Sequence, residues 1–187
     1  MDQVHQDQLL GIARDAVRDA VQGREISVPE VEEAELNALC GCFVTLKQGD
    51  HLRGCIGRFV SDCPLVESVV EMGRAAACED PRFVNHRIVP DELSRLHLEI
   101  SVLSPLQRTD NPLDLRLGVD GIYIKRGHAS GCFLPQVATE TGWSQEEFLS
   151  ICCAHKAGLP SDAWQDPQTE VYLFTAEVFG ALFVDIP

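Results

Sequence analysis

The sequence feature that most constrains the fold is a pair of strand-forming segments joined by a short turn. Gly41 to Lys47 is rich in residues that favour strands, Gln48-Gly49-Asp50 supplies a turn, and His51 to Phe59 returns as a second strand. A second hairpin is predicted over residues 118–135, with its turn at 126–128. Strands joined by tight turns pair antiparallel, so the pattern predicts a mixed, mainly antiparallel sheet.

Helices are predicted between these hairpins. Apolar residues recur at helical spacing over 9–21, and a helix begins at Pro64 in the first helical position. Ser144 and Glu147 form a capping box for a helix over about 145–157. An alternating strand is predicted over 96–103 and a long last strand over 169–179. We therefore predict an α+β fold with helices flanking the sheet.

The domain organisation is predicted to be a single domain over residues 1–187, because no repeat or flexible linker interrupts the chain. Residues 104–117 contain Pro105 and Pro112 and form the longest stretch without periodicity. We expect this stretch to divide the domain into two lobes. Residues 24–40 are ambiguous, and Glu30 to Leu39 is compatible with a short acidic helix.

The charge of the chain excludes some partners. The formal net charge is −14, which repels a phosphate backbone and an anionic membrane surface, so neither nucleic acid nor membrane is predicted as a partner. No apolar run approaches the roughly 20 residues that span a bilayer. Met1 to Gln8 is polar and acidic rather than a secretory signal, which predicts a cytoplasmic protein.

The eight cysteines are interpreted as reduced thiols, because the predicted compartment is reducing. Cys40-x-Cys42 and Cys152-Cys153-x-His155 lack the paired spacing of structural zinc ligands, so no metal site is predicted. Walker A and dinucleotide-binding glycine patterns are absent as well. The motifs therefore identify no cofactor.

Leu52 to Gly57 is the stretch with the clearest potential for chemistry. On a regular strand, Arg53 and Cys55 share one face, and a guanidinium beside a thiol favours the reactive thiolate. Backbone amides around Gly54 and Gly57 are suited to binding an anion or an oxyanion. A buried structural cysteine is the alternative, since cysteine is among the most buried residue types.

The segment after the helix that begins near Pro64 is a candidate second wall of the site. It reads Asp80-Pro81-Arg82-Phe83 and continues to His86. Asp80 and His86 are candidates for proton transfer, and Arg53 and Arg82 for holding an anionic or carbonyl-containing substrate. The alternative is a solvated loop without a function.

Together these segments carry a family resemblance. Leu52-Arg53-Gly54-Cys55-Ile56-Gly57, preceded by Gly41 to Leu46, resembles the signature of the AMMECR family, whose bacterial and archaeal members are called AmmeMemoRadiSam system protein A. The resemblance extends from about residue 9 to 180. It includes Ala75-Ala76, Asp80 to Phe83, Ile100 to Leu103, Gly118 to Gly121, Leu134-Pro135-Gln136-Val137, Lys156 to Leu159 and Trp164.

The resemblance implies a two-lobed α+β domain around a cleft lined by the signature. In bacteria and archaea it also implies genomic association with a Memo-like protein and a radical SAM protein, which are therefore the expected partners. It supplies no reaction. One hypothesis is an enzyme with catalytic Cys55, Asp80 and His86, and with substrate bound by Arg53, Gly54, Gly57, Arg82 and Gln136. A second is a non-catalytic ligand-binding or adaptor module. A third is a tight hairpin packed only for stability.

Overall fold

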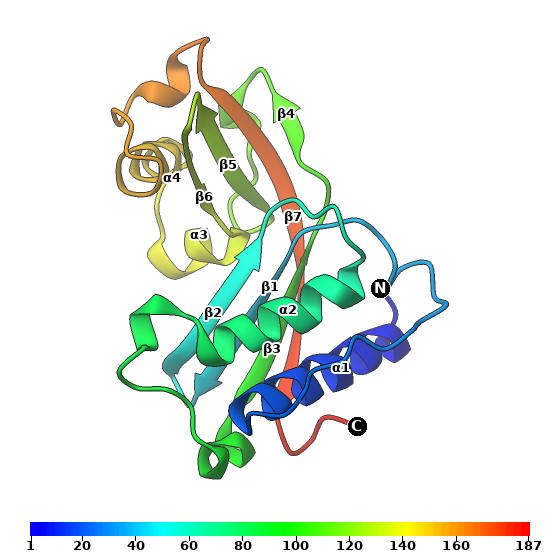
Figure 1. The fold of residues 1–187 in the computed structure, drawn as a ribbon. Helices are drawn as coiled ribbons and strands as arrows, with labels where there is room; N and C mark the ends of the chain where they lie inside the picture. Colours follow the sequence, from blue (N-terminus) through cyan, green and yellow to red (C-terminus); the bar gives the residue numbers. More distant parts are fainter. The chain divides into compact units, whose positions relative to one another are not determined.

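The computed structural model describes all of residues 1–187 and confirms the α+β fold class (Figure 1). The chain divides into two compact units. Unit 1 comprises Met1–Leu103 and Glu177–Pro187, and unit 2 comprises Ser104–Ala176. Each unit has its own antiparallel strand pairs and its own apolar core.

The sheet of unit 1 contains the predicted first hairpin. Strands β1 (Cys42–Gln48) and β2 (His51–Arg58) pair antiparallel, and β1 also pairs antiparallel with β3 (His97–Leu103). The strand order is β2-β1-β3-β7, so β2 lies at an edge. The long strand β7 (Glu170–Leu182) contributes its residues from Glu177 onward to this unit.

Two helices of unit 1 pack against each other and against this sheet (Figure 1). Helix α1 (Gln3–Val21) begins earlier than its apolar periodicity predicted, because Asp2 caps it by accepting from the His5 amide. Helix α2 (Leu65–Cys78) has Pro64 at its N-cap rather than inside the first turn. Val44 and Leu46 of β1 are fully buried on the face of the sheet that forms the core with these helices.

Two short 3₁₀ helices connect α2 to β3. They are η1 (Pro81–Phe83) and η2 (Pro90–Arg95). Within residues 30–39 only a turn at residues 34–37 forms, so the acidic helix considered for Glu30 to Leu39 is absent. No helix in the structure is both long and apolar enough to cross a membrane.

Unit 2 contains the second predicted hairpin, formed by β5 (Asp120–Arg126) and β6 (Ala129–Phe133). The first part of β7 pairs antiparallel with β5 and with the short strand β4 (Gln107–Thr109). Two further 3₁₀ helices are η3 (Pro112–Asp114) and η5 (Ala163–Gln165).

The helices of unit 2 are short. They are α3 (Pro135–Thr141) and α4 (Gln145–Ile151). The predicted capping box of Ser144 and Glu147 is present at the start of α4. The helix predicted to continue to about residue 157 changes at Cys152–Lys156 into a π-helical turn. Phe148 and Leu149 are fully buried in the core of this unit.

Candidate functional site

Cys55 lies on the edge strand β2, directly opposite Thr45 of β1. The Thr45 hydroxyl donates a hydrogen bond to the Cys55 sulfur at 3.3 Å. Residues directly opposite in an antiparallel pair share a face, and Val44 and Leu46 point to the other face. The Cys55 side chain is partly exposed. The thiol therefore lies on the face of the unit 1 sheet that is opposite the helix-covered core.

A β-bulge separates Arg53 from this face. Gly54 pairs with Leu46 and Leu52 pairs with Lys47, which leaves Arg53 as the extra residue of β2. The Arg53 Nη1 donates to the Gln48 side chain at 3.0 Å, and Gln48 alternates with Leu46 on the helix-covered face. The expectation that Arg53 and Cys55 share a face is therefore wrong, because the bulge interrupts the alternation on which it depended.

Arg53 instead forms a paired contact with Glu92 of η2. Its Nη1 and Nη2 atoms donate to the two carboxylate oxygens at 2.6 and 3.2 Å, and Nη2 also donates to the His86 carbonyl at 3.3 Å. The side chains are only 15% and 20% exposed, and the Arg53 guanidinium lowers the pKa of Glu92. Arg53 thus anchors the segment from His86 to Glu92 to β2. The His86 ring is exposed and forms no hydrogen bond with Cys55.

Asp80 is a buried carboxylate immediately after α2, and its side chain is 1% exposed. It accepts the Cys55 amide at 2.9 Å, and the Arg82 amide, Nε and Nη2 at 3.1, 2.9 and 2.6 Å. These donors, Arg82 first, lower the pKa of Asp80 to about 2. Asp80 is therefore a weak base at neutral pH, and its bonds favour an anchoring role over proton transfer.

Arg82 is the cation beside Cys55. Its Nη2 donates to the Cys55 carbonyl at 2.9 Å, and its guanidinium carbon lies 5.6 Å from the centre of the Phe83 ring. The pKa of Arg82 is raised, chiefly by Asp80 and further by the Cys55 side chain. Its side chain is 53% exposed. Part of the guanidinium is thus accessible to a ligand next to the thiol.

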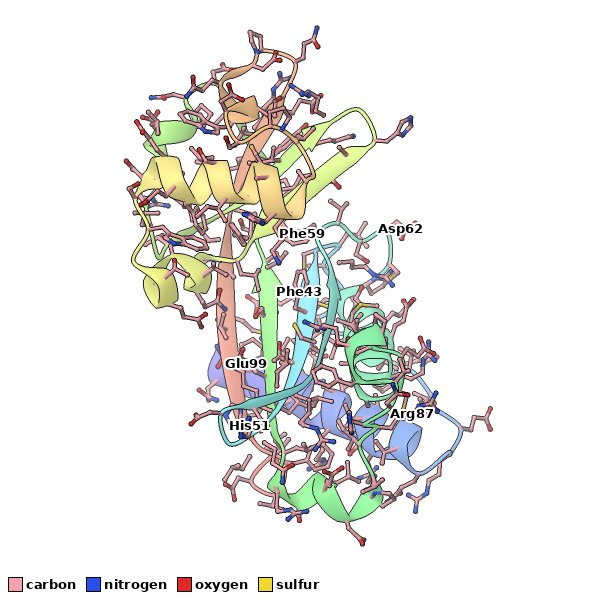
Figure 2. The ribbon with its side chains drawn as sticks, turned by 90° about the vertical axis from the view of Figure 1, so that its left-hand side faces the viewer. Phe43, His51, Phe59, Asp62, Arg87 and Glu99 are labelled. Atoms are coloured by element: carbon pink, nitrogen blue, oxygen red, sulfur yellow. The ribbon has the colours of Figure 1, made fainter.

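The two glycines of the motif serve close packing. A Cβ on Gly54 would lie 2.0 Å from the Ala76 carbonyl oxygen, so the backbone of α2 passes directly over this residue. A Cβ on Gly57 would lie 2.3 Å from the Phe43 ring, which Figure 2 labels on β1. Contact of Gly54 and Gly57 with a substrate stays a prediction. The structure explains by close packing why both positions are glycine.

Gln136, the last of the predicted site residues, belongs to unit 2 at the start of α3. Its Oε1 is buried and has no hydrogen-bond partner. For a metal, no group of three or more ligating side chains converges anywhere in the structure. Burial also shifts two other thiols: it raises the pKa of the buried Cys42 to about 12 and that of the half-buried Cys132 to about 11.

Three residues around Cys55 and Arg53 were missed from the sequence: Thr45, Gln48 and Glu92. Thr45 could have been identified from the sequence, because the turn at 48–50 sets a hairpin register that brings it near Cys55. Glu92 is 39 residues from Arg53, and no local pattern signals so distant a pair.

Comparison with known proteins identifies the family. The AMMECR1 family model matches residues 10–179. A protein from Thermococcus gammatolerans is 44% identical over 182 residues, which cover 91% of this chain and 87% of that protein. A protein from Methanothermobacter thermautotrophicus is 42% identical over 178 residues, covering 91% of each chain.

A solved structure is also similar. The crystal structure of an uncharacterised protein from Pyrococcus horikoshii matches with a TM-score of 0.82 and 39% sequence identity. The match covers 93% of this chain and 90% of that chain. Family model, sequence relatives and solved structure agree over nearly the whole length, and the chain belongs to the AMMECR1 family.

Proposed function

We propose that unit 1 carries a thiol site that captures a small anionic or carbonyl-containing molecule. The observation that supports this most is the Arg82 guanidinium, which Asp80 holds against Cys55 while the Arg82 side chain stays half exposed. A guanidinium in a fixed orientation is well suited to a carboxylate or to a developing oxyanion. Cys55 is then the nucleophile or covalent anchor, and Arg82 holds the substrate.

Addition of the Cys55 thiol to a carbonyl group needs only a cation and a route for one proton. The Cys55 sulfur forms a bond to a carbonyl carbon, the C=O π electrons move to the oxygen, and the thiol proton finishes on that oxygen. Arg82 donates to the oxygen as its negative charge develops. Of the two predicted proton-transfer residues, Asp80 is committed to four hydrogen bonds, which leaves His86 or water to move the proton.

A protection experiment tests this proposal. Glyoxylate carries an aldehyde and a carboxylate, so it probes both functions of the site. We expect glyoxylate to slow the alkylation of Cys55, measured by peptide mass spectrometry, and to leave the rate at Cys78 unchanged. The protection should be lost in Arg82→Met. The same test is made with pyruvate and with acetate. If none of the three probes changes the rate of Cys55 alkylation, the proposed site loses its support.

A specific feature of the site also supports the alternative of a non-catalytic binding or adaptor module. Asp80 is held by hydrogen bonds from the Cys55 amide and from Arg82, and its lowered pKa makes it a weak base for the thiol proton. Protection of Cys55 without turnover of the bound molecule would favour a binding or adaptor module. The cytoplasmic location and the Memo-like and radical SAM partners remain predictions. Co-purification of those partners with the Cys55→Ala variant would support the adaptor role.

A further inference from the structure

Both tyrosines of the chain lie on the face of the unit 2 sheet that is opposite its core. Strands β4, β7, β5 and β6 lie side by side in this order (Figure 1). Ile122, Ile124 and Val171 are buried on one face, in the core that includes side chains of α3 and α4. Side chains alternate along a strand, so Tyr123 of β5 and Tyr172 of β7 lie on the other face. We call this second surface the tyrosine face.

The strand registers place the two tyrosines in one row with a cation. Arg108 of β4 pairs with Tyr172, and Tyr172 pairs with Tyr123. Directly paired residues of antiparallel strands share a face, with Cβ atoms about 5 Å apart. The two tyrosine rings have centroids 6.1 Å apart and planes inclined at 49°, and both residues are partly exposed. The rings form an aromatic floor with the exposed Arg108 beside it.

The neighbouring row adds a second cation and one carboxylate. Lys125 of β5 pairs with Glu170 of β7, two residues along from the tyrosines. The Tyr172 hydroxyl donates to the Glu170 carboxylate, so this carboxylate already has a partner on the face. The hydrogen bond from Tyr172, and then the charges of Arg108 and Lys125, lower the pKa of Glu170. Both cations therefore act on the same part of the tyrosine face.

Neither cation is neutralised by a salt bridge. Arg108 and Lys125 are exposed and form none, whereas Arg126, which alternates to the other face, pairs with Asp166. The four strands place only Arg108, Lys125 and Glu170 as charged side chains on the tyrosine face. The charge of this face is therefore positive, in a chain whose net charge is −14. Two cations beside an aromatic floor are suited to an aromatic ring with an anionic group.

We propose that the tyrosine face binds a small aromatic molecule that carries a carboxylate or a phosphate. Its ring lies on Tyr172 and Tyr123, and its anionic group accepts hydrogen bonds from Arg108 and Lys125. Glu170, through the bond from the Tyr172 hydroxyl, fixes the position of that ring. The site uses no residue of the Cys55 site and does not depend on the function proposed there.

The ligand class is tested by NMR on protein with isotope-labelled tyrosine. The chain has two tyrosines, so every labelled signal reports on this face. The probe 2-naphthoate carries a ring and a carboxylate, cyclohexanecarboxylate lacks the aromatic ring, and 2-naphthylmethylammonium reverses the charge. We expect saturable shifts with 2-naphthoate, and binding at least about fivefold weaker for the other two.

A parallel titration with 2-naphthyl phosphate distinguishes the two anionic groups. Saturable binding of either naphthyl anion supports the site, and the tighter of the two identifies the natural group. Absence of saturable shifts with both anions would overturn the proposal. Equally tight binding of the ammonium probe or of cyclohexanecarboxylate would overturn it as well.

Variants test the residues. Arg108→Met and Lys125→Met each remove one cation at an exposed position, so both variants should fold. We expect each to weaken 2-naphthoate binding about three- to tenfold, and the double variant to lose the salt dependence of binding. Tyr172→Leu removes half of the floor and should weaken binding as reported by Tyr123. Arg87→Met, which removes an exposed arginine of unit 1, is the matched control. Unchanged affinity in the double variant would contradict the site.

Discussion

The carboxylate of Asp80 accepts the backbone N–H of Cys55 at 2.9 Å, which joins the end of α2 to the edge of β2. Arg82, bonded to the same carboxylate, donates to the Cys55 carbonyl at 2.9 Å. The two side chains thus supply the acceptor and donor that a neighbouring strand would offer. The backbone of Cys55 is fixed at the sheet edge, and its thiol is left on the sheet face beside a guanidinium.

This anchor predicts a pH-dependent loss of stability. The folded pKa of Asp80 is lowered to about 2 from 3.8, so its contribution is present above pH 4 and is lost as the pH falls toward 2. Because Arg82 is half exposed, we expect about 1–2 kcal/mol rather than the full linkage value. Asp80→Asn should therefore lower the free energy of unfolding at pH 7 and have much less effect near pH 2.

Denaturant titrations at both pH values measure this difference. Glu146→Gln, at an exposed position without an ion pair, is the control and should show no such dependence. An Asp80→Asn effect of equal size at pH 7 and pH 2 would contradict the anchoring role of the charged carboxylate.

Gly54→Ala should destabilise the protein strongly. The added Cβ would lie 2.0 Å from the Ala76 carbonyl oxygen. The backbone of α2 cannot move away from it without disturbing the core. We expect a loss of about 3 kcal/mol or more. Gly11→Ala is the matched control in α1, where the nearest atom is 3.5 Å away and the change should stabilise by about 0.5–1 kcal/mol. Equal effects of the two substitutions on denaturant midpoints would contradict the close contact.

The Arg53–Glu92 pair should show a measurable coupling. Its two hydrogen bonds join side chains that are 15% and 20% exposed, so water screens the pair only in part. A double-mutant cycle of Arg53→Met and Glu92→Gln should give about 1–2 kcal/mol. The Arg74–Glu79 pair is 40% and 52% exposed and should give about 0.5 kcal/mol or less. Reversal of this order would argue against Arg53 as the anchor of η2.

Native thiol labelling should be selective. Burial raises the pKa of Cys42 to about 12, so at pH 8 its thiolate fraction is on the order of 10⁻⁴. Cys132, with a pKa of about 11, is protected for the same reason. We expect both to stay unlabelled by iodoacetamide in the folded protein and to react in denaturant. Peptide mass spectrometry measures the labelling of each cysteine. Labelling of Cys42 as fast as that of Cys55 would contradict the prediction.

The local elements of the fold could be predicted from the sequence. Alternation and turn residues located both hairpins, and the capping box located the start of α4. The short strand β4 was missed because its three residues are too few for a periodic pattern. The π-helical turn after Ile151 was missed because the apolar spacing continues through it.

The site was predicted less completely. Asp80 and Arg82 could be selected as polar residues after a helix, but their bonds to the Cys55 backbone depend on how α2 packs against β2. The role given to Arg53 failed because a one-residue bulge reverses side-chain direction, and the sequence carries no clear mark of it. Arg82 has therefore replaced Arg53 as the cation beside the thiol.

The central claim is that Arg82 makes the surroundings of Cys55 attractive to small anions. The most direct measurement is the ratio of alkylation rates at Cys55 with anionic iodoacetate and neutral iodoacetamide, relative to the same ratio in the unfolded chain. We predict a ratio about three- to tenfold higher in the folded protein, falling toward that of the unfolded chain in 1 M salt and in Arg82→Met. Arg74→Met, which removes an exposed arginine elsewhere, should keep the excess. A folded-protein ratio at or below the unfolded value would contradict the claim.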